Sequence, residues 1–360
     1  MGYQLLSDTV VLLDHKAAVD KIYSNYKFYD DSVVSASLKS QLFHIVSPYD
    51  RKTTVSDDVG QDVNRQRSKR KKVAEVFDET TEKVRSNHTE FLKLSNLPAP
   101  TEECDNRTAL EFVDGFNRDD RYDRSKTYNG ANSTQFVVLA EFASQSYLIP
   151  PNCRFFNSEV SNLANLLAPD DRFDFVVLDP PWWNKYIRRT KAVNSKISYQ
   201  MLDNNSIGNI PLGDYVHENT IVAIWCTNSP THVAAIRENF CTKWKLKLVA
   251  NWYWVKVTKF GEPVCAFNGS NKKQPYEQIF IAVGENNTTF EIPKERFIYS
   301  VPSAFHSNKP PLVDLFESLL PERPKCLEIF ARNVYPNFTS VGTEVLKLQN
   351  ANLFDVVKRV

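Results

Sequence analysis

The stretch FDFVVLDPPW, residues 173–182, constrains the fold more than any other part of this sequence. Its apolar beginning is typical of a central β-strand that is buried on both faces. Two consecutive prolines must end that strand, because proline fixes φ and lacks the amide hydrogen that a sheet requires. The acid before the prolines, Asp179, therefore lies at the carboxyl end of a buried strand, the edge at which ligands bind in open α/β sheets.

Short apolar runs rich in β-branched and aromatic residues continue after residue 132 and alternate with helical segments. This alternation predicts an α/β domain in which helices flank a largely parallel sheet. The expected strands are residues 173–178, 220–226, 246–257, 278–283 and 326–331, and the expected helices are residues 161–167, 230–240 and 310–320.

The first 130 residues differ from the rest, being polar and dense in charge. The spacing of their apolar residues predicts a helix over residues 72–97, which the prolines of NLPAP end. The charged stretch NRDDRYDRSKTYNG, residues 117–130, predicts a solvated connector. We therefore expect residues 1–130 to form a smaller accessory domain that helps to bind nucleic acid, and residues 131–360 to form the main domain.

Charge and residue usage narrow the classes of partner. The net charge is only +1, so attraction to nucleic acid must come from local patches, such as RQRSKRKK at residues 65–72 and NKYIRRTK at residues 184–191. The first patch fits nuclear import, phosphate binding or a solvated helix start. The six cysteines form no CxxC pair and the six histidines no HExxH spacing, so no metal site is predicted. Without a long apolar run or a signal-peptide pattern, we expect a soluble intracellular protein.

The DPPW turn itself suggests a chemistry. The carboxylate of Asp179, the backbone carbonyl groups of Asp179 and Pro180 in the rigid loop that Pro180 and Pro181 impose, and the flat face of Trp182 together suit a planar heterocycle with an exocyclic amine. Two acceptors on such an amine would orient its lone pair toward an activated methyl group, without a covalent intermediate. The alternative interpretation is a simple strand-ending turn with Trp182 packed in the core.

Several motifs in order resemble one family. DPPW is followed by HSNKPPL at residues 306–312, LEIFARN at 327–333 and TSVGTEVLKLQ at 339–349, as in the N6-adenine methyltransferases typified by the messenger RNA N6-adenosine enzyme. The resemblance covers residues 153–348 and implies a permuted Rossmann-like sheet, because DPPW precedes the expected cofactor-binding strand. NWYWVKV and NKKQPYE are most similar to the lineage linked to small nuclear RNA.

The resemblance implies S-adenosylmethionine as the cofactor, and the absence of GxGxxG disfavours a dinucleotide. Asp179 would contact the cofactor's amino group and Lys309 its carboxylate. Lys309 also precedes the expected helix 310–320, whose positive end would attract a carboxylate. The remaining implied cofactor residues are Phe330 near the adenosine, Arg332 and Asn333 at the ribose hydroxyls, Glu159 at the adenine, and Thr343 and Glu344 near the ribose.

The target base would stack on Trp182. The other expected substrate contacts are Lys185, Arg188, Arg189, Lys272 and Lys273 at phosphates, Glu277 and Asn228 near the base, and His306 at a ribose or phosphate. Exposed basic loops are also simply solvated in many proteins, and a lone histidine is often structural.

These inferences predict an S-adenosylmethionine-dependent enzyme that methylates the N6 amine of adenosine in RNA. The resemblance implies small nuclear RNA, with a 2′-O-methyladenosine target. We expect a nuclear location, with the cytoplasm as a second one. DNA adenine is the second choice of substrate. The alternative from another class is a catalytically silent RNA-binding scaffold.

Overall fold

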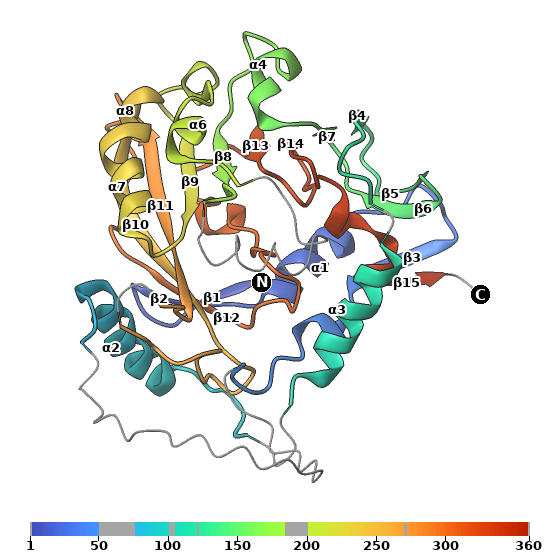
Figure 1. Ribbon diagram of the computed structural model, residues 1–360. Coiled ribbons are helices and arrows are strands. Elements are labelled where there is room, and N and C mark those ends of the chain that lie inside the picture. The colour runs from blue at the N-terminus through green and yellow to red at the C-terminus, as the bar shows by residue number, and fades with distance from the viewer. Residues whose placement is uncertain are drawn as a thin grey trace, which may run out of the picture.

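One large mixed sheet organises the computed structural model, which describes residues 2–49, 76–100, 105–120, 122–183, 201–269 and 272–358 (Figure 1). Within these residues the sheet has eleven strands. In spatial order they are β1 (Tyr3–Leu5), β2 (Val10–Leu13), β12 (Phe297–Ser300), β10 (Leu246–Lys256), β11 (Tyr276–Gly284), β9 (Ile221–Cys226), β8 (Phe175–Leu178), β13 (Cys326–Ile329), β14 (Phe338–Val341), β7 (Cys153–Asn157) and β4 (Tyr128–Asn132).

The centre of the sheet is parallel, as predicted. β7, β14, β13, β8 and β9 all run in one direction, whereas β11 runs against β9 and β10. β8 lies between β9 and β13, so the DPPW strand pairs directly with the strand of LEIFARN despite their separation in sequence. The carboxyl ends of these strands share one edge, which confirms the α/β, Rossmann-like fold class.

Smaller elements surround this sheet. β3 (Val33–Leu38) pairs with β15 (Phe354–Lys358), and β5 (Val138–Phe142) pairs with β6 (Gln145–Ile149). The helices are α1 (His15–Asn25), α2 (Glu79–Leu94), α3 (Arg107–Asp119), α4 (Leu163–Leu166), α6 (Asn204–Gly208), α7 (Pro230–Ala235) and α8 (Cys241–Lys243). None of the described helices is long and apolar enough to cross a membrane.

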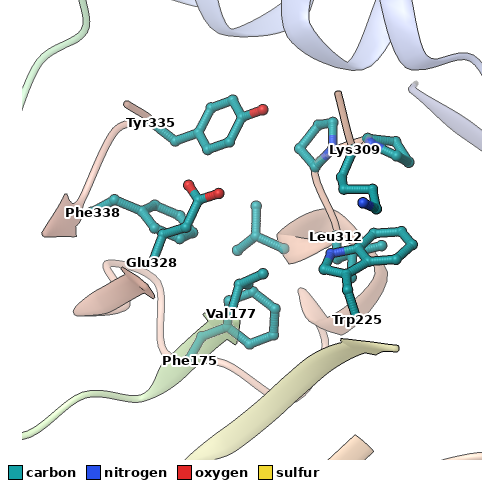
Figure 2. Close-up of a pocket in the computed structure, with 11 residues that line it drawn as sticks. Phe175, Val177, Trp225, Lys309, Leu312, Glu328, Tyr335 and Phe338 are labelled. Atoms are coloured by element: carbon teal, nitrogen blue, oxygen red, sulfur yellow. The ribbon is translucent and has the colours of Figure 1, made fainter. Parts of the chain in front are cut away.

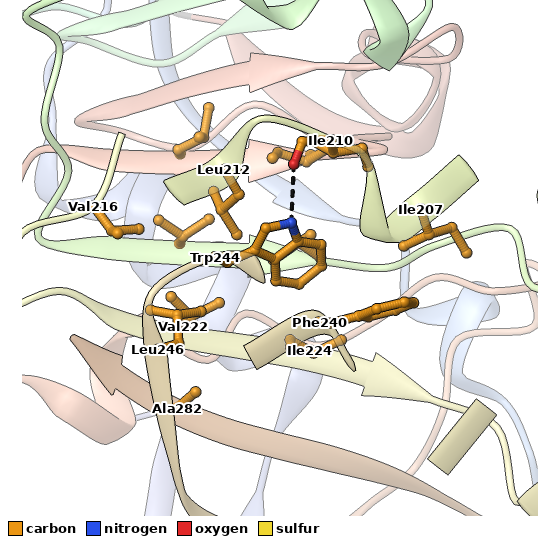
Figure 3. Packing of buried hydrophobic residues seen from close by; sticks show 14 of the residues in the cluster. Ile207, Ile210, Leu212, Val216, Val222, Ile224, Phe240, Trp244, Leu246 and Ala282 are labelled. Carbon is orange, nitrogen blue, oxygen red and sulfur yellow. Dashed lines mark hydrogen bonds between the residues drawn. The ribbon is translucent and has the colours of Figure 1, made fainter. Parts of the chain in front are cut away.

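Side chains alternate between the two faces of the sheet, and each face has its own core. Val176 and Leu178 of β8 face the cluster that also contains residues of α6, α7 and α8, while Phe175 and Val177 face the opposite cluster. Figure 3 shows the first cluster, in which the indole N–H of Trp244 donates to the carbonyl of Ile210 over 2.9 Å. Each fully buried large side chain contributes about 1.5–3 kcal/mol, so β8 is fixed from both sides.

Two predicted helices differ from the structure. Over residues 310–320 only a short 3-10 helix forms, at Val313–Phe316, because the two prolines supply no amide hydrogen and the first turn bond runs from the amide of Leu315 to the carbonyl of Leu312. Lys309 therefore does not precede a helix of useful length, and the predicted contribution of a helix dipole is wrong. The predicted helix over residues 72–97 is shorter within the described residues: α2 starts after Asp78, whose carboxylate caps the amide of Thr81 at 2.8 Å.

The predicted solvated connector is also wrong in part. α3 extends to Asp119, and Tyr122 and Arg124 then make contacts with the C-terminal part of the chain. The predicted division at residue 130 stays a prediction, although strands from both sides of it share the main sheet. The basic run at residues 65–72 lies outside the described residues.

Candidate active site

Charged side chains gather at the carboxyl edge of the sheet. Asp179 follows β8, Lys256 ends β10, and Glu277 lies at the start of the antiparallel strand β11, which brings it to the same edge. Lys309 comes from the HSNKPPL loop and reaches both acids. The sheet thus brings together groups that are up to 130 residues apart in sequence.

Asp179 and Lys309 form the centre of this site. The ammonium group of Lys309 donates to Oδ2 of Asp179 at 2.9 Å and to Oδ1 at 3.1 Å. The hydroxyl of Ser307 donates to Oδ2 of Asp179 at 3.2 Å and accepts from Lys309 at 2.9 Å. Burial would lower the pKa of Lys309, but Asp179 and Glu277 outweigh it and raise that pKa. Lys309 is therefore a cation at neutral pH.

Glu277 continues the charge pattern. Its Oε2 lies 3.3 Å from the ammonium group of Lys309, and its Oε1 accepts from Lys256 at 2.5 Å. Burial alone would raise the pKa of Glu277, but the two ammonium groups together lower it to about 2. The carboxylate of Glu277 is therefore ionised. It forms the second ion pair of Lys309, in addition to the one with Asp179.

The DPPW turn folds back on itself. The amide of Trp182 donates to the carbonyl of Pro180 at 2.8 Å, and the carbonyl of Pro181 accepts from the amide of Leu202 at 3.0 Å. A carbonyl oxygen has two lone pairs, so Pro180 keeps one acceptor site for a ligand.

Trp182 is part of the core. Its side chain is 5% exposed, its indole N–H donates to the carbonyl of Trp225 at 3.0 Å, and its ring centroid lies 4.8 Å from that of His232 and 6.2 Å from that of Phe240. This placement corrects the prediction that Trp182 offers a free face to a base, and it agrees with the alternative in which Trp182 packs in the core. The exposed ring is that of Trp183, at 39%.

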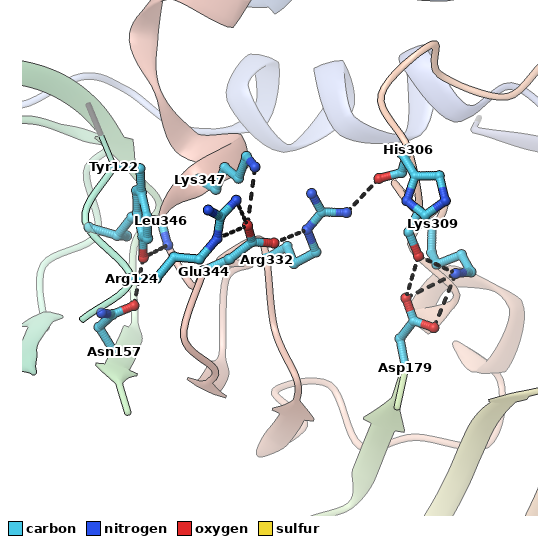
Figure 4. A network of polar contacts seen from close by, with 11 residues as sticks. Tyr122, Arg124, Asn157, Asp179, His306, Lys309, Arg332, Glu344, Leu346 and Lys347 are labelled. Carbon is cyan, nitrogen blue, oxygen red and sulfur yellow. Dashed lines mark hydrogen bonds and ion pairs between the residues drawn. The ribbon is translucent and has the colours of Figure 1, made fainter. Parts of the chain in front are cut away.

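A second polar cluster lies beside the first (Figure 4). Oε2 of the buried Glu344 lies 2.9 Å from Nε of Arg332, and Oε1 accepts from Lys347 at 3.1 Å and from Arg124. Nη1 of Arg332 donates to the carbonyl of His306. Burial would raise the pKa of Glu344, but the three cations lower it to about 2. Glu344 was predicted near the cofactor ribose, whereas the structure shows its carboxylate engaged by protein cations.

The other predicted residues take different positions. Phe330, Asn333 and Thr343 are half-buried at the ends of β13 and β14, and Glu159 is exposed after β7.

The residues predicted to contact the substrate are also spread out. Asn228 donates to the carbonyl of Tyr276 at 2.8 Å and accepts from Gln278 at 3.2 Å, so it joins the ends of β9 and β11. His306, Lys272 and Lys273 are exposed, and Lys273 lies 5.5 Å from the ring of Tyr49. The predicted phosphate contacts Lys185, Arg188 and Arg189 lie outside the described residues.

Sequence reasoning missed several groups at this edge. Ser307 contacts Asp179 and has a φ of 58°, a strained value of the kind found at functional sites. Glu328 lies on β13 in an otherwise apolar strand, and that isolated acid was the signal that could have identified it. Lys256 and Arg124 carried no local signal.

Glu328 borders a small cavity of about 20 Å³, with Lys309 on its other side (Figure 2). Among the described residues its buried Oε2 has no hydrogen-bond partner. Burial raises the pKa of Glu328 to about 8, and the charge of Asp179 acts in the same direction. Asp179, Lys309 and Glu328 therefore offer both signs of charge and an unpaired carboxyl oxygen. This set fits a ligand that carries an ammonium and a carboxylate group.

No group of histidine, cysteine and acidic side chains suited to a metal ion occurs in the part of the chain that the structure describes.

Comparison with known proteins gives a consistent result. The family model described as MT-A70 matches residues 173–344. Human N(6)-adenine-specific methyltransferase METTL4 is 34% identical over 237 residues, which are 63% of this chain and 49% of the human protein. A Caenorhabditis elegans DNA N6-methyl methyltransferase is 32% identical over 219 residues, 60% of this chain and 58% of that protein. N6-methyladenosine RNA methyltransferase MTA1 of Pyricularia oryzae is 32% identical over 222 residues, 59% of this chain and 58% of that protein. The chain thus spans between about half and three fifths of the length of these relatives.

Proposed function

This chain belongs to the MT-A70 family through residues 173–344, and on that premise we propose that it is an enzyme that transfers a methyl group from S-adenosylmethionine to the N6 amine of adenine. The observation that carries the proposal is the pairing of Asp179 and Lys309 at the carboxyl end of β8, at 2.9 Å. The carboxylate of Asp179 can accept a hydrogen bond from an amine. Together with the ammonium group of Lys309 it also offers one negative and one positive charge to the amino-acid end of a ligand.

S-adenosylmethionine, when bound, supplies a methyl group on its sulfonium sulfur. Asp179 would hold its ammonium group and Lys309 its carboxylate, so each would exchange a protein partner of opposite charge for a ligand partner. Phe330, Arg332 and Asn333 follow β13 at the same edge, within reach of the nucleoside end. Because each buried charge stays paired, the exchange avoids the desolvation cost of an isolated ion.

Asp179 and the carbonyl of Pro180 would accept hydrogen bonds from the target amine. The nitrogen lone pair, otherwise delocalised into the adenine ring, would then face the methyl carbon. The nitrogen–carbon bond would form as the carbon–sulfur bond breaks, with the electron pair of that bond left on sulfur. The proton that the amine loses would pass to the Asp179 carboxylate, which accepts its hydrogen bond, and from there to water. Orientation and fixed charges account for the acceleration in this mechanism.

We propose RNA as the polymer, with adenosine of small nuclear RNA bearing a 2′-O-methyl group as the target, and with nuclear location. The relatives include both an RNA and a DNA N6-methyltransferase, so DNA adenine is the second candidate. In either polymer the base must leave its stack to reach Asp179. The exposed Lys272 and Lys273, with Lys185, Arg188 and Arg189, are the proposed phosphate contacts, and Trp183 replaces Trp182 as the exposed ring proposed to stack on the base.

The test is to incubate the purified chain with S-adenosylmethionine labelled in its methyl group and with short RNA and DNA oligonucleotides. RNA with and without a 2′-O-methyl on the adenosine is included, and the labelled nucleoside is identified. We expect N6-methylated adenosine in RNA. Label in DNA alone would reverse the choice of polymer. Absence of cofactor binding by the folded protein in calorimetry would favour the silent scaffold.

We predict that Asp179→Asn lowers methyl transfer at least about 100-fold, the scale of losing a charge-stabilising group at a reaction centre. Asparagine keeps the size of the side chain but removes the charge that faces Lys309. The matched control is Asp174→Asn before β8, at the opposite edge of the sheet, where the carboxylate accepts from the amide of Lys325 at 2.7 Å. Equal rates in Asp179→Asn and the native protein would remove Asp179 from the mechanism.

A further inference from the structure

The segment between α3 and β4 is attached to the edge of the candidate site. The hydroxyl of Tyr122 donates to Asn157 at the end of β7 over 2.7 Å, and it accepts from the hydroxyl of Tyr128 at 2.7 Å and from the amide of Leu346 at 3.3 Å. The side chain of Asn157 in turn donates to the carbonyl of Lys126. These bonds fix residues 122–128 against β7 and the chain that follows β14.

Arg124 lies in this attached segment and contacts the buried acid Glu344. Its Nε and Nη2 both contact Oε1 of Glu344, whose side chain is 6% exposed. Lys347 contacts the same oxygen. Because these cations hold Oε1, the other oxygen of Glu344 is directed to Arg332, at 2.9 Å. The orientation of Glu344 thus depends on a side chain 220 residues earlier in the sequence.

Arg332 is oriented from two sides as a result. Its Nε lies 2.9 Å from Oε2 of Glu344 as an ion pair without hydrogen-bond geometry, and its Nη1 donates to the carbonyl of His306, so Nη2 makes neither contact among the described residues. The loop of His306 continues to Ser307 and Lys309, which contact Asp179. Figure 4 shows this connection from Arg124 to Asp179.

We propose that Arg124 is a positioning residue of the cofactor site, which fixes Glu344 and through it holds Arg332 toward the ribose hydroxyls of the bound nucleoside. The inference rests on the proposed function, because it takes S-adenosylmethionine as the ligand. Two guanidinium nitrogens of Arg124 converge on Oε1 of Glu344, whereas Lys347 brings a single ammonium group to the same oxygen. Without Arg124 the position of Oε1 would depend on Lys347 alone, and one ammonium group on a flexible stem restrains it less.

The test compares two ligands by calorimetry: S-adenosylhomocysteine and its analogue that lacks both ribose hydroxyls. Native protein should bind the parent about tenfold or more tightly than the analogue, as expected for hydrogen bonds to a charged group. In Arg124→Gln that ratio should fall to about threefold or less, while affinity for the analogue changes little. Arg124→Lys should give an intermediate ratio, and it keeps the test available if the glutamine variant does not fold.

Lys126→Gln is the matched control, because Lys126 is an exposed cation of the same segment and the change removes the same charge. Its ligand ratio should equal that of the native protein. An unchanged ratio in Arg124→Gln, or an equal loss for both ligands, would overturn the proposal. Native protein that binds the parent ligand but transfers no methyl group would contradict the proposed function alone, whereas native protein that does not bind it would contradict both.

Discussion

Charged side chains at the carboxyl edge alternate in sign. Asp179 contacts Lys309, Lys309 contacts Glu277, and Glu277 contacts Lys256. Removal of Lys309 would leave the carboxylate of Asp179 without a cation among the described residues, and an unpaired buried charge costs several kcal/mol. A ligand that carries both charges can replace the Asp179–Lys309 contact without such a penalty. This alternation explains how a binding site can be both charged and stable in the absence of its ligand.

Trp182→Ala should act on stability rather than on base stacking. The ring is buried, its N–H is bonded to Trp225, and truncation of a buried tryptophan costs about 3–5 kcal/mol. Urea unfolding measures this loss. Trp182→Phe, which keeps a ring but loses the bond to Trp225, should cost less. A normal stability of Trp182→Ala with a raised KM for RNA would instead support the stacking role.

Glu328→Gln should change the pH dependence of stability. Glu328 releases its proton at a pKa of about 8 in the native state, against 4.5 for an unperturbed glutamate. Between these values the unfolded state binds fewer protons, so the native protein loses stability as pH rises, by up to about 1.4 kcal/mol per pH unit from this group. The contribution of protonated Glu328 to the free energy of unfolding is fully present below pH 4.5 and is lost above about pH 8.

Urea unfolding at pH 5 and pH 8 measures the effect. Relative to the native protein, Glu328→Gln should be more stable at pH 8 than at pH 5, because glutamine does not ionise. Glu322→Gln is the control, since Glu322 is exposed. Parallel pH dependence in Glu328→Gln and the native protein would show that Glu328 is not held protonated.

At the level of elements, the ends of β13 and β14 shape the site. Phe330, directly after β13, has a φ of 65°, in the left-handed region that costs a non-glycine residue free energy. The amide of the next residue, Ala331, donates to the carbonyl of Val341 at 3.0 Å. Gly342 follows, and a Cβ there would lie 2.5 Å from the carbonyl oxygen of Ala331. The close approach of the two backbone segments that follow β13 and β14 therefore holds Phe330 in place.

Gly342→Ala should push apart the backbone segments that follow β13 and β14. Because the conflict is with backbone atoms, we expect a loss of about 1–3 kcal/mol in stability and weaker binding of S-adenosylmethionine. Thermal unfolding and calorimetry measure the two effects. Gly115→Ala in α3 is the control, since a Cβ there meets nothing within 4 Å. It should leave binding unchanged and raise stability by about 0.5–1 kcal/mol. Normal binding in Gly342→Ala would contradict this account of Phe330.

At the level of the whole molecule, the N-terminal residues complete the structure of the rest. β2 pairs with β12, and residues of α1, β3 and α3 share one cluster with Phe305, Leu348 and Phe354. Phe305 directly precedes the loop of His306 and Lys309, and its ring lies 5.1 Å from that of Phe116 in α3. The N-terminal part therefore supports the site loop by packing as well as through Arg124.

A chain limited to residues 131–360 should fail to form a stable monomer. It would uncover the edge of β12, whose Phe297, Ile298 and Tyr299 are at most 3% exposed in the full chain. Uncovered apolar edge strands promote aggregation. Size-exclusion chromatography and thermal unfolding of the shortened and full chains test this expectation. A soluble, cooperatively folding fragment would show that residues 131–360 are an independent domain.

The sequence by itself determined the central strands, the turn at Asp179 and the fold class, because burial patterns and proline geometry act locally. The family resemblance assigned Asp179 and Lys309 to two groups of one ligand, and the contact between them came from the structure. Only the tertiary structure placed Trp182 in the core, replaced the expected helix at residues 310–320 with a short 3-10 helix, and brought Arg124 to Glu344. The physical reason is that these outcomes depend on which distant side chains compete for the same space and charge, and neither spacing nor composition records that competition.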